Sequence, residues 1–336
     1  MQWFDGHLDL AYIAQHGRDL CESPEHCGGT LQPATVTFSS LAAGGVTRAI
    51  STLFVRQSRD GVDGDYCFSN EAEAFRAAMR QVDMHQVWEA ERRIAIAKDE
   101  SPKTKDKDPL LRVALAIEGA ACLRCVEDAD LFAAAGVRMV SLAWAEGSKW
   151  AGGDQSGGDL TADGKALARH LDQLGIAHDV SHLSEQAFWS LLETASGPVV
   201  ASHSNCRTLL PGARHPERHL SDAQINALAA RPGSIIGINL FARFLIPPDE
   251  LTRRRATCAD VVQHLDHVAQ LAGRRDFLAL GSDMDSGFGA DLLPVDLRGP
   301  QQLIHLSEAL SAAGWSDAEV HQFANRWEEL PGFGHV

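Results

Sequence analysis

The stretch WFDGHLD (residues 3–9) begins as an apolar run and ends in His-x-Asp. Its apolar start is typical of a buried β-strand, and His7 and Asp9 stand two positions apart at its end. Side chains two apart on a strand point to the same side of the sheet. Two polar side chains on one side are unfavourable in a core, but they suit the binding of a metal ion.

Seven further apolar runs of strand length follow, and helical patterns separate most of them. Together with residues 3–9, the candidate strands are 46–55, 112–119, 137–144, 175–181, 197–202, 234–240 and 277–283. The segments with helical periodicity are 70–98, 128–136, 161–175, 184–195, 221–231, 258–273 and 316–327. Strands that alternate with helices predict parallel pairing with right-handed crossovers. Eight such units predict a closed (β/α)8 barrel of the TIM type, with residues 1–336 as a single domain that ends in a helix.

The composition excludes several classes of partner. The 336 residues are 45% hydrophobic, which is enough for a large core, and carry a formal net charge of −15. That charge argues against nucleic acid and against anionic membrane surfaces. No run approaches the roughly 18 apolar residues of a membrane span, and the N-terminal residues lack a signal-peptide pattern. We therefore expect a cytoplasmic protein, and the seven scattered cysteines are typical of free thiols there.

Polar residues stand where five of the predicted strands end, which is the end that carries the chemistry in such barrels. These residues are His7, Asp9, Glu118, His182, His203 and Asp283. A single histidine or aspartate at a strand end is more often a structural residue or a turn former. The runs VALAIEG (113–119) and FLALGSD (277–283), however, carry Glu118 and Asp283 directly from buried strands. A buried carboxylate needs a cation or hydrogen-bond donors, so the set as a whole favours a metal site.

The mixture of imidazoles and carboxylates indicates which ions are expected. Such ligands suit Zn, Mn, Fe or Co rather than Ca. Three histidines and three carboxylates are more than one tetrahedral ion needs. We therefore expect two divalent metal ions, with zinc as the first candidate, that share a bridging carboxylate and activate a bridging water.

Several of these residues lie in short motifs that occur in a fixed order along the chain. The motifs are DGHLDL (5–10), IEGA (117–120), DVSH (179–182), SHSNCR (202–207), the stretch from Arg218 to Ser221, and GSDMD (281–285). Any one of them is weak, but the ordered set resembles the renal dipeptidase (membrane dipeptidase) family of zinc peptidases, peptidase family M19, within the amidohydrolase-like barrels. The resemblance runs from residue 5 to about residue 287 and covers most of the chain.

The resemblance implies a role for each residue. His7 and Asp9 are implied as ligands of one ion, His182 and His203 as ligands of the other, and Glu118 as the bridge. Asp283 is implied as the catalytic group that takes the proton of the bridging water and returns it to the leaving amine. Arg218 is implied as the group that binds the substrate carboxylate, a task that suits a planar guanidinium. The implied activity is the hydrolysis of dipeptides, including those of the L,D type, by a metal-bridged hydroxide, and the family also implies a homodimer.

One position departs from the family pattern. The family commonly has a histidine near the reacting carbonyl, at the end of the strand before the DVSH strand, and this chain has Trp144 there. Tryptophan donates one hydrogen bond but cannot take up a proton and become positively charged. We therefore expect Trp144 to contact the substrate without the proton-binding role that a histidine can have. Two alternatives therefore stay open: an amidohydrolase that acts on another small amide, such as an N-acyl amino acid, and a catalytically degraded barrel that only binds.

Other catalytic motifs are absent from the sequence. It has no G-x-S-x-G nucleophile motif and no phosphate-binding G-x-x-x-x-G-K-[ST] loop. The segment GGDQSGGD (152–159) is rich in glycine and lacks a basic residue, so we predict a flexible loop over the barrel mouth. The charged segment 98–108 is predicted as a surface loop.

Overall fold

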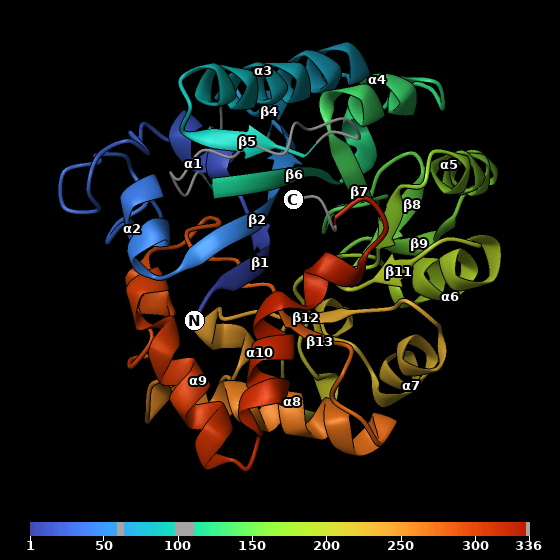
Figure 1. The fold of residues 1–336 in the computed structure, drawn as a ribbon. Helices are drawn as coiled ribbons and strands as arrows, with labels where there is room; N and C mark the ends of the chain where they lie inside the picture. The colour runs from blue at the N-terminus through green and yellow to red at the C-terminus, as the bar shows by residue number, and fades with distance from the viewer. Residues whose placement is uncertain (59–63, 98–110, 334–336) are drawn as a thin grey trace.

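Eight parallel strands surround a common axis in the computed structural model, which describes residues 1–58, 64–97 and 111–333 (Figure 1). They are β1 (Trp3–Leu8), β2 (Val46–Phe54), β6 (Leu111–Glu118), β7 (Val137–Ser141), β10 (Ala177–Asp179), β11 (Val199–Val200), β12 (Ile236–Ile238) and β13 (Leu278–Leu280). Each lies within, or within one residue of, one of the eight predicted runs. All of them except β6 are shorter than the predicted runs, mainly because residues at their carboxyl ends leave the sheet to line the barrel mouth.

The strands follow one another around the ring in the order of the chain. Regular ladders join β1, β2, β6, β7, β10 and β11, and a separate ladder joins β12 to β13. A parallel bridge between Ala201 and Ile236 connects these two sheets. Between β13 and β1 there is no regular ladder among the described residues, but the Asp283 amide donates to the His7 carbonyl over 3.2 Å. The predicted (β/α)8 barrel is therefore present, with its weakest lateral pairing beside the site residues His7 and Asp283.

Helices cover the outside of this ring (Figure 1). The α-helices are α1 (Leu10–Gln15), α2 (Phe38–Ala43), α3 (Glu71–Ala90), α4 (Asp128–Ala135), α5 (Ala162–Gln173), α6 (Glu185–Thr194), α7 (Asp222–Ala230), α8 (Cys258–Ala272), α9 (Leu303–Ala312) and α10 (Asp317–Asn325). Hydroxyl side chains cap several of them, as the sequence predicts: Thr161 accepts from the Gly164 amide, and Ser184 from the Ala187 amide. Such caps satisfy amide groups that have no partner inside the helix.

Two predicted segments have a different structure. The helical pattern of 70–98 ends early, because α3 stops at Ala90 and β5 (Ile94–Ile96) then pairs with β6. Residues 152–159 do not form a free loop. Most of them belong to an antiparallel hairpin of β8 (Ala151–Gly153) and β9 (Gly157–Leu160), and a further short pair joins β3 (Arg56–Gln57) to β4 (Cys67–Phe68). The predicted charged loop 98–108 lies outside the described residues.

A second apolar cluster fills the inside of the ring, apart from the larger core between strands and helices. It takes at least one residue from seven of the strands and Ile235 from just before β12, and three aromatic or aliphatic residues of the C-terminal segment complete it. These three are Trp327, Leu330 and Phe333. A Cβ atom added at Gly6 would meet the Trp327 ring at 2.3 Å, so this indole lies directly against β1. The C-terminal segment thus closes the floor of the barrel, opposite the site.

Helix length and the state of the cysteines bear on the environment of the chain. No helix in the described ranges is both long and apolar enough to cross a membrane. The seven cysteines all lie in these ranges, and no two of them form a disulfide bond.

Candidate metal centre

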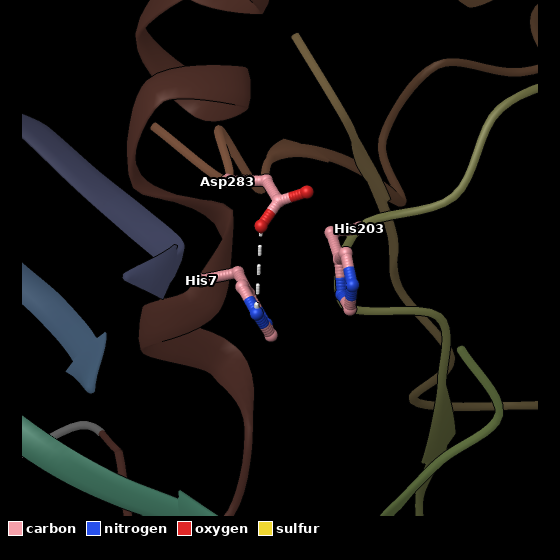
Figure 2. A group of neighbouring side chains, drawn as sticks. All are labelled: His7, His203 and Asp283. Atoms are coloured by element: carbon pink, nitrogen blue, oxygen red, sulfur yellow. Dashed lines mark ion pairs between the residues drawn. The ribbon is translucent and has the colours of Figure 1, made fainter. Parts of the chain in front are cut away.

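Six buried or nearly buried acids and histidines converge at the carboxyl ends of the strands. His7 comes from β1, Asp9 precedes α1, Glu118 ends β6, and His182, His203 and Asp283 follow β10, β11 and β13. Their donor atoms form three overlapping groups, in each of which the atoms lie within 4.8 Å of one another. The groups are His7–Asp9–Glu118, Glu118–His182–His203 and His7–His203–Asp283. The structure therefore brings together all six residues that the sequence singles out, and Figure 2 shows the third group.

Glu118 is the residue that two of these groups share. Its Oε2 atom lies 3.7 Å from the Nε2 atom of His7, whereas its Oε1 atom lies 3.1 Å from Nε2 of His182 and 3.5 Å from Nε2 of His203. The two carboxylate oxygens thus face different imidazoles. This is the arrangement that a carboxylate bridging two cations requires.

On the His7 side of the cluster, one imidazole nitrogen lacks a hydrogen-bond partner among the described residues. The Nε2 atom of His7 is buried and has no hydrogen-bond partner among the described residues. It lies 3.8 Å from Oδ1 of Asp9. It also lies 3.8 Å from Oδ1 of Asp283, a contact that Figure 2 marks with a dashed line. A buried nitrogen without a partner is costly, and acids at this distance are too far for a hydrogen bond. A divalent cation between these atoms would satisfy all three, so the residues present fit a metal ion.

Burial also shifts the pKa values of the cluster, and a bound cation would reverse the shift of the acids but reinforce that of the histidines. Burial and the neighbouring Asp283 raise the pKa of Asp9 to about 8, and burial raises the pKa of Glu118 well above its ordinary value. Burial lowers the pKa of His182 to about 4 and that of His7 far below its ordinary value. Uncharged imidazoles are the form that binds metals, and a bound cation would stabilise the carboxylates in their charged form.

Further polar side chains orient the histidines, and none of them was predicted from the sequence. The Nδ1 atom of His182 lies 2.9 Å from Oδ2 of Asp154, which belongs to the β8–β9 hairpin. The Nδ1 atom of His203 lies 2.6 Å from Oγ of Ser202, whose hydroxyl donates to Asp179. With Nδ1 as the donor, each ring directs the lone pair of Nε2 into the cluster. The only signal for Asp154 was its place in the glycine-rich segment that was predicted as a loop.

Asp283 is held at the edge of the cluster by the strands next to it. Its Oδ2 atom accepts a 2.7 Å hydrogen bond from the Asn239 side chain, and its backbone has a φ of +60°. His182 also has a positive φ, of +70°. Residues other than glycine rarely adopt this conformation, and where they do, they often belong to functional sites. Burial raises the pKa of Asp283 to about 6, although Arg218 and Asn239 oppose the rise.

Arg218 borders the cluster beside His203 and is almost fully buried, in the short 3-10 helix Pro216–Arg218. One terminal nitrogen donates to the His203 carbonyl over 2.8 Å, and the other donates to the Ser204 hydroxyl over 3.2 Å. Its Nε atom lies 4.0 Å from Oδ2 of Asp154 and has no hydrogen-bond partner among the described residues. The guanidinium therefore retains a donor that the described residues do not use.

Trp144 lies beyond the end of β7 and is half-buried at the mouth. Its ring centroid is 5.8 Å from that of His182 and 5.1 Å from that of Phe54. Tyr12 contacts Phe54 on the other side, and Tyr66 contacts Tyr12. We call these four residues, Tyr12, Phe54, Tyr66 and Trp144, the aromatic wall. The wall gives one side of the mouth a rigid, largely apolar surface next to a candidate metal ligand.

Comparisons with known proteins identify the family. The family model described as membrane dipeptidase (peptidase family M19) matches residues 1–326. An uncharacterized protein from the pqqA 5′ region of Klebsiella pneumoniae is 31% identical over 218 residues, which cover 62% of this chain and 76% of that protein. Three further curated relatives are matched over 57% or less of their own length.

Two solved structures have the same fold. Dipeptidase AC, a metallopeptidase of family M19, has a TM-score of 0.79 at 23% identity and covers 99% of both chains. A metallopeptidase from Rhodobacter sphaeroides, crystallised with a phosphinate mimic of the dipeptide L-Ala-D-Ala, has a TM-score of 0.78 at 22% identity, over 97% of this chain and 96% of that one. The family match over residues 1–326 shows that the chain belongs to the membrane dipeptidase family, peptidase family M19, which consists of metal-dependent peptide-bond hydrolases.

Proposed function

We propose that this protein hydrolyses dipeptides at a centre of two divalent cations, with zinc as the first candidate. His7 and Asp9 would hold one cation, His182 and His203 the other, and Glu118 both. The observation that carries the proposal is that the two oxygens of Glu118 face different imidazoles, at 3.7 Å on one side and 3.1 Å and 3.5 Å on the other. When bound, such a pair of cations lowers the pKa of a water molecule and polarises the carbonyl of the scissile bond.

Asp283 is proposed to move the proton. Its carboxylate lies beside the His7 side of the cluster, and although burial raises its pKa to about 6, this value still leaves most of it ionised at neutral pH. It can therefore accept a proton from the attacking water. Asp283 would then give this proton to the nitrogen of the leaving residue. Asn239 holds Oδ2 and leaves Oδ1 directed toward the cluster.

Arg218 and Trp144 are proposed to position the substrate. The free Nε–H of Arg218 would donate to the carboxylate of the leaving residue, and burial strengthens a charge-assisted hydrogen bond of this kind. Trp144 would border the scissile carbonyl from the side of His182. The Rhodobacter sphaeroides neighbour was crystallised with an L-Ala-D-Ala mimic, which supports including L,D dipeptides among the candidate substrates.

The test is the replacement of Asp283 by Asn. The amide keeps the size of the side chain and its contact with Asn239 but cannot accept a proton. We expect kcat to fall by about 10²–10⁴-fold, whereas the metal content, measured by plasma mass spectrometry, stays the same. Asp291→Asn, at a side chain that is 64% exposed, serves as the matched control. Normal dipeptide hydrolysis by the Asp283 variant would contradict the assignment.

Trp144 is the observation that favours a second candidate function, hydrolysis of another small amide such as an N-acyl amino acid. Loss of a hydrogen-bonding group at the oxyanion typically costs about 10²–10³ in rate, and Trp144 replaces the family histidine. A panel of L,L and L,D dipeptides beside N-acyl amino acids separates the two. Turnover of acyl compounds alone would favour the second function. No turnover together with near-zero metal content after purification with zinc or manganese would favour a barrel that only binds.

A further inference from the structure

A second arginine stands at the mouth of the barrel, on the side away from Arg218. Arg56 lies in β3, directly after β2, whereas Arg218 follows β11. In the ring β1-β2-β6-β7-β10-β11-β12-β13 these two strands are four places apart out of eight, and thus opposite one another. The candidate metal centre lies between them. An extended dipeptide whose carboxylate is bound by Arg218 would therefore direct its amino-terminal residue toward Arg56.

The guanidinium of Arg56 rests on the aromatic wall. Its Cζ atom lies 5.4 Å from the centroid of the Trp144 ring, and Trp144 in turn contacts the ring of His182. An arginine stacked on a ring keeps its N–H groups in the plane of the guanidinium, where they can still bind a carboxylate. The wall thus holds the cation in place without using its hydrogen-bond donors.

The donors of Arg56 are not used by the rest of the described chain. Its Nε atom is buried and has no hydrogen-bond partner there, and none of the described acids forms an ion pair with its side chain. Asp9, Glu118 and Asp283 lie in the metal cluster instead. A buried guanidinium donor without a partner is costly and would be satisfied by an anionic ligand.

We propose that Arg56 and the aromatic wall bind an acidic side chain on the amino-terminal residue of the substrate, so that the preferred substrates are dipeptides beginning with Glu or Asp. This inference rests on the proposed dipeptidase function. The other charged groups of a dipeptide fit Arg56 less well, since its α-ammonium would be repelled and its carboxylate is assigned to Arg218. An acidic side chain is the remaining partner of matching charge.

The experiment compares L-Glu-L-Ala with L-Gln-L-Ala, which differ only in the charge of the first side chain. For the metal-loaded protein we expect kcat/KM to favour L-Glu-L-Ala by about tenfold or more, as for a charge-assisted hydrogen bond in place of a neutral one. Arg56→Met should bring this ratio close to one, and Arg56→Glu should make L-Lys-L-Ala the better substrate. Arg253→Met, at a side chain that is 74% exposed, is the matched control and should keep the wild-type ratio. Because each ratio is measured on one preparation, partial loss of folded protein cancels.

Three results would overturn the inference alone, while dipeptides are still hydrolysed. One is an equal Glu-to-Gln ratio in wild type and Arg56→Met. Another is an Arg56-dependent preference for L-Ala-L-Glu over L-Ala-L-Gln, which would place the acid on the leaving residue. The third is an equal loss on every substrate in Arg56→Met, which would assign Arg56 to the common carboxylate. Turnover of no dipeptide by the metal-loaded wild type would overturn the proposed function, and the inference with it.

Discussion

Each histidine of the candidate metal centre has a second ring nitrogen, and the partner of that nitrogen decides which way the ring faces. Asp154 accepts from His182, and Ser202 lies next to Nδ1 of both His203 and His7, at 2.6 Å and 3.4 Å. Such partners fix the tautomer and raise the basicity of the ligand. We therefore expect the metal affinity of the site to depend also on residues that are not metal ligands themselves.

Replacing Asp154 by Ala tests this dependence at the residue scale. We expect zinc affinity to fall by about 10–100-fold, because His182 loses the acceptor that orients it. Competition with a chromophoric chelator measures the affinity directly. Asp159→Ala, at an exposed position of the same hairpin, should leave the affinity unchanged. Equal affinities for the Asp154 variant and wild type would show that the hydrogen bond to His182 has no such role.

The sequence predicts residues that end a strand better than residues that reach the site from elsewhere. His7, Glu118 and His203 could be anticipated because parallel strands bring their carboxyl ends to one face. Asp154 could not, since it reaches the mouth from the β8–β9 hairpin outside the barrel. Its approach depends on packing between segments that are distant in sequence, and no spacing rule describes it.

At the scale of single elements, the strands were predictable because each is a short apolar run bounded by turn residues. The helical pattern of 70–98 was wrong at its end, where Ile94–Ile96 forms β5. Helix-forming residues such as Glu89 and Ala90 continue up to that point, but Arg92 has a φ of +59°, which breaks the helix. Pairing with β6 then outweighs the local helical preference.

Asp172, near the end of α5, offers a test at this scale. Its carboxylate accepts from the Ser196 and Gly197 amides, both at 2.8 Å, and from the Ser196 hydroxyl, and it lies 2.7 Å from Nε2 of His178. It thereby joins α5 to β10 and to the segment before β11. Asp172→Ala should lower the free energy of unfolding by about 2–4 kcal/mol at pH 7, because several donors lose their acceptor. Urea unfolding measures this loss.

The stability that Asp172 contributes should decrease as the pH falls. Burial alone would raise the pKa of Asp172, but the hydrogen bonds from His178, Ser196 and Gly197 outweigh it and lower the pKa below its ordinary value. Because the pKa is lower in the folded state, the ionised carboxylate stabilises the fold above about pH 4, and this contribution is lost as the pH falls below that value. The difference between wild type and Asp172→Ala should therefore shrink in acid. Asp163→Ala, at an exposed position of α5, should keep a free energy of unfolding within about 0.5 kcal/mol of wild type. A loss as large as that of Asp172→Ala would contradict the role of the hydrogen bonds to Asp172.

At the scale of the whole molecule, the C-terminal segment closes the barrel that the N-terminal strand begins. Trp327 is fully buried, lies against Gly6 and donates to the Leu280 carbonyl over 2.7 Å. The sequence predicted a C-terminal helix, but the position of Trp327 inside the ring could not be predicted, because it depends on space left by glycines in β1 and β12.

Trp327→Ala should lower the free energy of unfolding by about 3–5 kcal/mol, the usual loss for a large aromatic residue in a core. If residues 1–336 form a single domain, as predicted, urea unfolding should remain one cooperative transition at a lower midpoint. Trp189→Ala, at a half-buried position of α6, should cost less. An unchanged midpoint for Trp327→Ala would contradict the role of the C-terminal segment as the floor of the barrel.

The central claim is that imidazoles and acids from five strands converge on two cations. Anomalous diffraction at the zinc edge, from a crystal grown with zinc, tests it most directly. We predict two peaks about 3.5–4 Å apart, one next to His7 and Asp9 and one next to His182 and His203, with Glu118 between them. A single peak, or none at this position, would contradict the account.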